Sequence, residues 1–350
     1  MTWLTSDNAG PVAPEIMAAL ADANSGYASG YGADALMDQV RDQIRDIFEA
    51  PDASVHLVPT GTAANALALA CLANPWDAIY CGDQAHVEWD ECGAPEFFTG
   101  GAKMVVIDGE NGQFTPDALA AKLQTGTRTD VHQMQRGAVT ITNTTELGAV
   151  YTAAEIAALC AVAREFDMPC HLDGARFANA IAATGARPAE MTWKAGIDAV
   201  SFGGTKNGCM GVEAVILFDP KRDWEFQLRR KRAGHLFSKH RYLSAQMAAY
   251  LQDGLWLTLA ARANAASARL KSGLEATGAR LIHGAGANML FAEFTTAQHK
   301  DLQAKGMHYY LWPHTAHLDG LNDAMVGCRL VTNWSTTDAE IDAFVTAVAG

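Results

Sequence analysis

Short apolar runs alternate with helical patterns over the first two thirds of the chain. Seven of them are typical of strands buried on both faces, at 55–58, 78–81, 104–107, 138–142, 168–172, 198–202 and 213–217. Between the fourth and fifth runs, apolar residues recur at helical spacing from about Ala153 to Phe166, behind a capping box of Thr152 and Glu155. This alternation predicts an α/β fold with a mostly parallel, seven-stranded sheet flanked by helices.

Capping residues predict where two other helices begin. One is predicted from Asp34 to Phe48, with Asp34 as its N-cap. The last helix of the chain is capped by Thr337 with Glu340.

The pattern changes after about Arg241. A helical region rich in Ala and Leu reaches about Thr277, and short apolar runs and the last helix come after it. We therefore predict a large domain over residues 1–240 and a smaller α+β domain over residues 241–350. No linker rich in Pro, Gly or Ser separates the two.

Composition narrows the class of partner. The formal net charge of −13 disfavours binding to nucleic acid or to an anionic membrane. No run approaches the roughly 18 apolar residues of a membrane span, and the first residues lack the basic and apolar regions of a signal peptide. Seven scattered cysteines with no C-x-x-C pair predict free thiols of a reducing cytoplasm. His314 and His317 have no third ligand beside them, so we expect no metal site.

Two strand ends carry groups suited to a phosphate and to a ring nitrogen. In VPTGTAANALALA, Gly61 and Thr62 follow a strand and open a helix, whose free N–H groups can hold a phosphate; a simple helix cap is the alternative. In CHLDGARF, Asp173 ends a strand at the edge where open parallel sheets bind ligands. Its carboxylate can pair with a cationic ring nitrogen, and Arg176 can receive a carboxylate or a phenolate. An internal ion pair between Asp173 and Arg176 would explain the same two residues.

Lys206 and His86 follow two further strands. Lys206 lies among glycines in SFGGTKNGCMG, where a lysine in the crevice could form a Schiff base. His86, five residues after the run AIYC, could stack on a flat ring, although a lone histidine is usually structural. A phosphate site, a stacking histidine, an aspartate for a pyridinium nitrogen and a Schiff-base lysine together indicate pyridoxal phosphate chemistry.

The chain resembles the fold-type I pyridoxal-phosphate enzymes and, within them, the threonine aldolase family. The segments SDNAGPVAPEIMAAL, YGAD, HLDGARFANA and SFGGTKNG carry the match, which runs over nearly the whole chain. The resemblance implies a cytoplasmic lyase that cleaves L-threonine or L-allo-threonine to glycine and an aldehyde. Alternatives with the same cofactor are a β-eliminating lyase, a transaminase, a racemase and an aldolase that prefers phenylserine. A non-enzymatic protein that binds a phosphorylated ligand is an alternative of another class.

Carried over to this sequence, the resemblance implies a cofactor role for several residues. Lys206 would hold pyridoxal phosphate covalently, Asp173 would pair with its ring nitrogen, and His86 would stack over the ring. The phosphate would be held by Gly61, Thr62, Ala63 and Thr205.

The same resemblance implies how an amino-acid substrate binds. Ser6, Arg176 and Arg329 correspond to positions that bind the substrate carboxylate. His132, in TDVHQMQ, resembles a histidine near the substrate hydroxyl, and Glu91 resembles an acidic residue near the stacking histidine.

A glycine-rich segment points to a second subunit. NSGYASGYGADA resembles the family segment that approaches a neighbour's cofactor, with Tyr31 as the contacting residue. The resemblance therefore implies a homodimer or a homotetramer with sites at the subunit interface.

Overall fold

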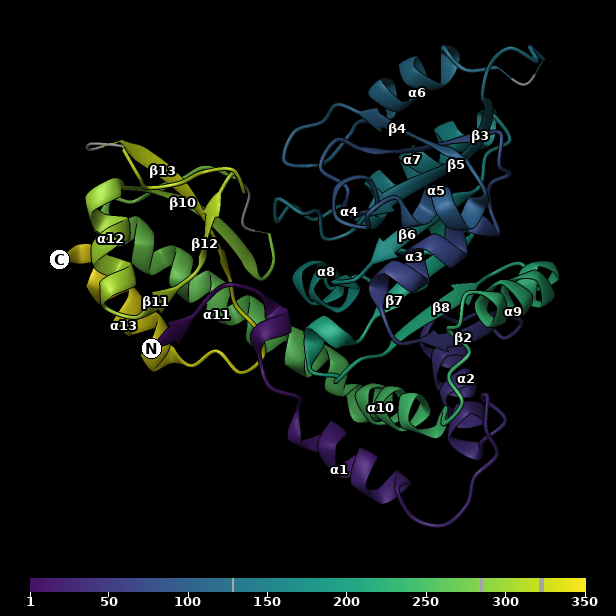
Figure 1. The fold of residues 1–350 in the computed structure, drawn as a ribbon, viewed down its shortest axis with the longest axis horizontal. Coiled ribbons are helices and arrows are strands. Elements are labelled where there is room, and N and C mark those ends of the chain that lie inside the picture. Colours follow the sequence, from purple (N-terminus) through teal and green to yellow (C-terminus); the bar gives the residue numbers. More distant parts are fainter. Residues whose placement is uncertain (128, 284–285, 321–323) are drawn as a thin grey trace.

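The central sheet has seven strands, as the apolar runs predicted. In the computed structural model, which describes residues 1–127, 129–283, 286–320 and 324–350, their order is β2-β8-β7-β6-β5-β3-β4 (Figure 1). The strands are β2 Ser54–Val58, β3 Asp77–Gly82, β4 Lys103–Ile107, β5 Gln135–Thr142, β6 Cys170–Gly174, β7 Ala199–Gly203 and β8 Glu213–Leu217. Each predicted run overlaps one of them, so the predicted sheet is confirmed.

Strand β8 runs against its neighbours. It pairs antiparallel with both β2 and β7, whereas the pairings among β7, β6, β5, β3 and β4 are parallel. The first residue of β8, Glu213, therefore lies beside Val58 and Gly203 at the ends of β2 and β7. One edge of the sheet thus gathers the carboxyl ends of the parallel strands and the start of β8.

Helices cover both faces of this sheet (Figure 1). Because successive strand residues point to opposite faces, Val200 and Phe202 pack in one core and Ala199 in another. All residues of β2, β6, β7 and β8 are buried, as is typical of strands covered on both sides. The helices are α1 Pro14–Ala23, α2 Ala35–Ile47, α3 Gly61–Ala70, α4 His86–Trp89, α5 Ala94–Thr99, α6 Pro116–Gln124, α7 Ala153–Glu165, α8 Phe177–Thr184, α9 Asp223–Arg232, α10 Arg241–Leu251, α11 Leu255–Thr277, α12 Thr296–Ala304 and α13 Asp338–Ala349.

The predicted helix starts are present. The Asp34 side chain accepts a hydrogen bond of 3.0 Å from the third backbone N–H after it and caps α2. Thr152 and Glu155 form a reciprocal capping box at α7, and Thr337 and Glu340 form one at α13. The three helix caps predicted from the sequence are therefore confirmed.

The helical region after Arg241 is two helices. α10 and α11 are separated at Asp253 and Gly254, which both have left-handed φ angles, of 50° and 70°. Gly254 tolerates this conformation because it has no Cβ.

A second, antiparallel sheet lies toward the C-terminus. Its order is β12-β13-β10-β9, with bounds Tyr310–Trp312, Met325–Val331, Met289–Thr295 and Arg280–Leu281. Residues of β10, β13, α11 and α13 share one apolar cluster. The first strand of the chain, β1 Thr2–Trp3, pairs with β11 Met307–His308, so the N-terminus lies beside these elements (Figure 1).

All seven cysteines are free thiols, and six of them are buried. In the described part of the chain, no helix combines the length and the apolar character needed to cross a membrane.

Candidate active site

A cavity of about 370 Å³ opens at the edge of the large sheet where the parallel strands end. Its walls come from the start of α3, from His86, from the end of β6 and from the turn after β7. The segment from Asp7 to Val12 forms a further wall. The structure thus brings together residues that lie far apart in the sequence.

The wall at α3 offers free backbone donors. Thr60 is the N-cap, and its hydroxyl accepts a hydrogen bond of 3.2 Å from the N–H of Ala63. The N–H groups of Gly61 and Thr62 line the cavity without such a partner among the described residues. A Cβ built on Gly61 meets no atom within 4 Å, so the space before the helix end is open. The N–H of Ala63, which was also predicted to hold the phosphate, donates to the Thr60 hydroxyl, so its part in phosphate binding stays a prediction.

Asp173 is fixed at the end of β6. It is 2% exposed; its Oδ1 accepts from the N–H of Ala175 at 3.1 Å and its Oδ2 from the Asn65 amide at 3.0 Å. His171, two residues earlier, bonds Thr140 and Ser201 on the neighbouring strands. Burial lowers the pKa of His171 to about 4, so the imidazole is neutral at physiological pH. The Asp173 carboxylate is therefore held by hydrogen bonds, and His171 beneath it on the same strand carries no charge.

His86 and Glu91 form an acid–base pair. His86 is the first residue of α4, just beyond β3, and its Nδ1 lies 2.8 Å from Oε1 of Glu91. Burial lowers the pKa of His86, but the hydrogen bond to Glu91 and the charge of Asp173 outweigh it, and the net pKa is raised. Burial also raises the pKa of Glu91, which accepts a second bond from Asn65.

Lys206 follows β7 in a short 3-10 helix, Thr205–Asn207, and lines the cavity. The buried Asn207 side chain anchors this turn by donating to the hydroxyl of Tyr250 at 2.7 Å and to a backbone carbonyl. A Cβ on Gly203 would lie 2.3 Å from the backbone oxygen of Ala175. Gly203 must therefore be a glycine, because the ends of β6 and β7 approach each other too closely for a Cβ atom at this position.

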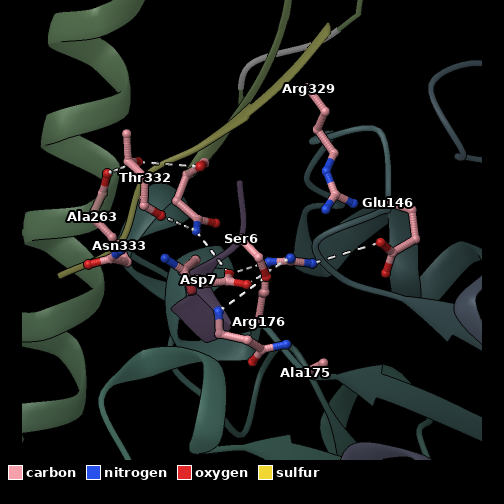
Figure 2. A network of polar contacts seen from close by, with 12 residues as sticks. Ser6, Asp7, Glu146, Ala175, Arg176, Ala263, Arg329, Thr332 and Asn333 are labelled. Carbon is pink, nitrogen blue, oxygen red and sulfur yellow. Dashed lines mark hydrogen bonds and ion pairs between the residues drawn. The ribbon is translucent and has the colours of Figure 1, made fainter. Parts of the chain in front are cut away.

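Arg176 is buried and paired with Asp7 (Figure 2). Its Nε donates to Oδ2 of Asp7 at 2.7 Å and its Nη2 to Oδ1 at 3.1 Å. Burial raises the pKa of Asp7, but the charges of Arg176 and Lys206 outweigh burial and lower it, so Asp7 is ionised. The alternative ion pair between Asp173 and Arg176 does not form among the described residues.

Arg329 reaches the same region from β13, as Figure 2 shows. Its Nη2 donates to the carbonyl of Thr5 at 3.3 Å, and its buried Nε has no hydrogen-bond partner among the described residues. Ser6 lies beside Asp7, where its hydroxyl accepts from the N–H of Asn8 at 3.2 Å. The three residues predicted to bind a carboxylate, Ser6, Arg176 and Arg329, are thus neighbours.

Two acidic residues of the site escaped the sequence analysis. Glu146 lies in the loop after β5, with its Oε2 3.9 Å from Nη1 of Arg176. Glu213 lines the cavity and accepts a hydrogen bond of 2.8 Å from the N–H of Gly204. Glu146 carried a usable signal, since it follows the end of β5 by four residues, just as His86 follows the end of β3. Glu213 carried none, because the sequence does not reveal that β8 runs backward.

His132 and Tyr31 lie away from the cavity and from the predicted residues grouped around it. His132 is exposed in the loop before β5, so it stands at the start of a strand whose other end points to the site. His132 therefore lies away from the cavity of its own chain, and its place near the substrate hydroxyl stays a prediction. Tyr31 is 53% exposed and lies on the surface beside Lys231, whose Nζ is 5.1 Å from the ring centroid.

The described residues contain no group of three His, Cys, Asp or Glu side chains placed to hold a metal ion.

Known proteins resemble this chain over nearly its whole length. The beta-eliminating lyase family model matches residues 4–297. A low-specificity L-threonine aldolase of Pseudomonas sp. (strain NCIMB 10558) is 40% identical over 96% of this chain and 94% of its own. One from Pseudomonas aeruginosa is 39% identical over 95% and 92%. The solved structure of a Leishmania major threonine aldolase matches 99% of this chain and 98% of its own, with a TM-score of 0.92 and 28% identity.

Proposed function

Because the chain belongs to the threonine aldolase family of the beta-eliminating lyases, we propose that it is a pyridoxal-phosphate-dependent carbon–carbon lyase. Its substrates are the β-hydroxy-α-amino acids L-threonine and L-allo-threonine, which it cleaves between Cα and Cβ to glycine and an aldehyde. The observation that carries the proposal is the meeting of Lys206, Asp173 and the open start of α3 around one cavity.

The residues of the cavity fit pyridoxal phosphate. The free N–H groups of Gly61 and Thr62, with the open space before Gly61, suit a phosphate at a helix N-terminus. Thr205 and Lys206 also line the cavity. The buried Oδ1 of Asn65, the residue that bonds Asp173, has no hydrogen-bond partner among the described residues. Its free acceptor supports a polar ligand beside Asp173.

The two arginines orient the substrate. When bound, the cofactor supplies a carbonyl for covalent capture of the amino group and an electron sink for charge developing at Cα. Arg176 and Arg329 bind the α-carboxylate, and this orientation decides which bond at Cα is aligned for cleavage. Asp173 keeps a proton on the ring nitrogen, which strengthens the sink.

His86 removes the proton of the β-hydroxyl group. Its Nδ1 is engaged by Glu91, so Nε2 is the nitrogen left to accept that proton. Glu91 stabilises the imidazolium that results. The same proton can return to Cα and complete glycine.

Turnover of threonine tests the proposal directly. The purified protein, loaded with pyridoxal phosphate, should release acetaldehyde and glycine from L-threonine and L-allo-threonine. Borohydride should fix the cofactor on Lys206, and Lys206→Ala should lose both the fixed label and the turnover. Formation of a keto acid in place of acetaldehyde would indicate a β-eliminating lyase. Faster turnover of phenylserine than of threonine would indicate an aldolase that prefers phenylserine. Unchanged aldolase activity in Lys206→Ala would refute the role of this lysine.

We also propose a homodimer or a homotetramer, with Tyr31 contributing to a neighbour's site. The free thiols are compatible with a reducing cytoplasm.

A further inference from the structure

Glu146 lies within the site although no motif pointed to it. Its side chain is 15% exposed, and among the described residues it makes an ion pair with Arg176 but no hydrogen bond. The loop that carries it is held in place, because the Asn143 amide bonds both the N–H and the carbonyl of Tyr151, at 3.0 and 3.1 Å. The backbone of this loop is thus held by hydrogen bonds, whereas the Glu146 carboxylate makes none among the described residues.

Cations from four elements face this carboxylate. Burial raises the pKa of Glu146, but the charges of Lys206, Arg176, His86 and Arg329 lower it below its ordinary value. Glu146 is therefore ionised at neutral pH. These four residues come from the turn after β7, the segment before α8, α4 and β13.

The two arginines that would bind a substrate carboxylate already face two carboxylates. Asp7 engages Nε and Nη2 of Arg176, which leaves Nη1 on the side of Glu146. Arg329 donates one hydrogen bond, from Nη2 to the carbonyl of Thr5. An incoming carboxylate needs the remaining N–H groups. Glu146, however, already forms an ion pair with Arg176 (Figure 2), and its charge also acts on Arg329.

We propose that Glu146 is a placeholder for the substrate carboxylate. It neutralises Arg176 and Arg329 while the site has no amino acid, and the substrate carboxylate replaces it when it binds. Glu146 therefore weakens the binding of every carboxylate ligand and sets the affinity for the amino acid. This inference rests on the proposed function only in taking the two arginines as the carboxylate site.

Two ligands that cannot react with the cofactor test this role. Butyrate and 3-hydroxybutyrate lack an amino group, and they differ from each other by the β-hydroxyl. Their dissociation constants are measured by titration calorimetry on the cofactor-loaded protein. Glu146→Gln should bind both about tenfold more tightly, which corresponds to about 1.4 kcal/mol. Glu165→Gln, which removes a charge from the exposed end of α7, should bind both as the unaltered protein does.

The outcomes separate this role from others. Unchanged or weaker binding of butyrate to Glu146→Gln would overturn the proposal. Weaker binding of 3-hydroxybutyrate alone would also overturn it, since it would show that Glu146 accepts a hydrogen bond from the β-hydroxyl. Glu146→Ala gives a second variant without the carboxylate, and thermal melts establish that each variant is folded. The assay needs no turnover, so a protein that failed to cleave threonine could still confirm or refute the placeholder.

Discussion

Glu91 favours the protonated form of His86. Burial alone lowers the pKa of His86, and the 2.8 Å hydrogen bond to Glu91 is the first of the interactions that reverse this. In Glu91→Gln the neutral amide cannot stabilise the imidazolium, so the pKa of His86 should fall below its present value. NMR titration of the histidine Cε1 protons in the variant and in the unaltered protein measures this.

The same substitution tests the catalytic role of His86. A base acts in its deprotonated form, so a lower pKa should move the acid limb of kcat/KM to lower pH. An unmoved limb, together with a shifted NMR titration, would show that His86 is not the base.

Glu213 should make stability depend on pH. Burial raises its pKa to about 7, although the N–H of Gly204 and the charge of Lys206 oppose this. The folded protein therefore holds this proton more tightly than the unfolded chain, where a glutamate titrates at about 4.3. The resulting stabilisation is complete below the unfolded pKa and is lost as the pH rises through about 7.

Glu213→Gln removes this dependence while keeping an acceptor for Gly204. At pH 8 the unaltered protein should have lost about 3 kcal/mol of unfolding free energy relative to the variant, compared with pH 5, at about 1.4 kcal/mol per unit of pKa shift. Denaturant unfolding at several pH values measures the difference. A constant difference between the two proteins across this range would contradict the prediction.

At the scale of single residues, the sequence revealed side chains that lie at, or shortly after, the carboxyl ends of parallel strands. Lys206, Asp173 and His86 were found in this way, because an apolar run marks a strand and therefore also marks where its carboxyl end lies. Asp7 was missed as a partner of Arg176, since 169 residues separate the two and only the fold brings them together. His132 precedes its strand, so this rule would not select it, and its predicted role rests on the family resemblance alone.

Two glycines at the ends of elements serve different purposes. At Gly61 a Cβ would meet no atom, whereas at Gly203 it would lie 2.3 Å from the backbone of Ala175. Gly61→Ala should therefore fold normally and lose affinity for pyridoxal phosphate, because the methyl group enters the space before α3. Gly203→Ala should lose stability by about 1–3 kcal/mol, because the ends of β6 and β7 must separate.

The two variants control for each other. Thermal melts report stability and absorbance of the bound cofactor reports affinity. Equal melting temperatures in both variants would show that the close approach at Gly203 can relax.

Elements were easier to predict than their directions. Seven apolar runs identified the seven strands, because strands buried on both faces are apolar throughout. Nothing in the run at 213–217 distinguishes an antiparallel strand from a parallel one. This direction alone brings Glu213 to the cavity.

The residues proposed to bind the substrate carboxylate come from distant parts of the chain. The N-terminal segment pairs with β11, continues past Thr5 and Ser6, and reaches Arg176 through Asp7. Arg329 comes from the antiparallel sheet. The predicted boundary between residues 240 and 241 stays a prediction, and the N-terminal segment contacts elements on both sides of it.

The subunit contribution of Tyr31 can be tested with hybrid oligomers. Tyr31 has a left-handed φ of 59°, is half exposed and is not among the described residues that line its own chain's cavity. If Tyr31 completes a neighbour's site, each site takes its lysine from one subunit and its tyrosine from the other. Lys206→Ala and Tyr31→Ala should then each impair activity. Mixing the two variants under conditions of subunit exchange should restore about a quarter of the sites, since half of random dimers are hybrids and each hybrid has one intact site.

The opposite arrangement gives a different result. If Tyr31 served its own chain, every site of a hybrid would lack either the lysine or the tyrosine, and mixing would restore nothing. Lys206→Ala mixed with the unaltered protein is the control, because it shows whether subunit exchange by itself changes the activity of intact sites. Recovery of aldolase activity after mixing the two variants, well above the sum of their separate activities, therefore measures whether the site is shared.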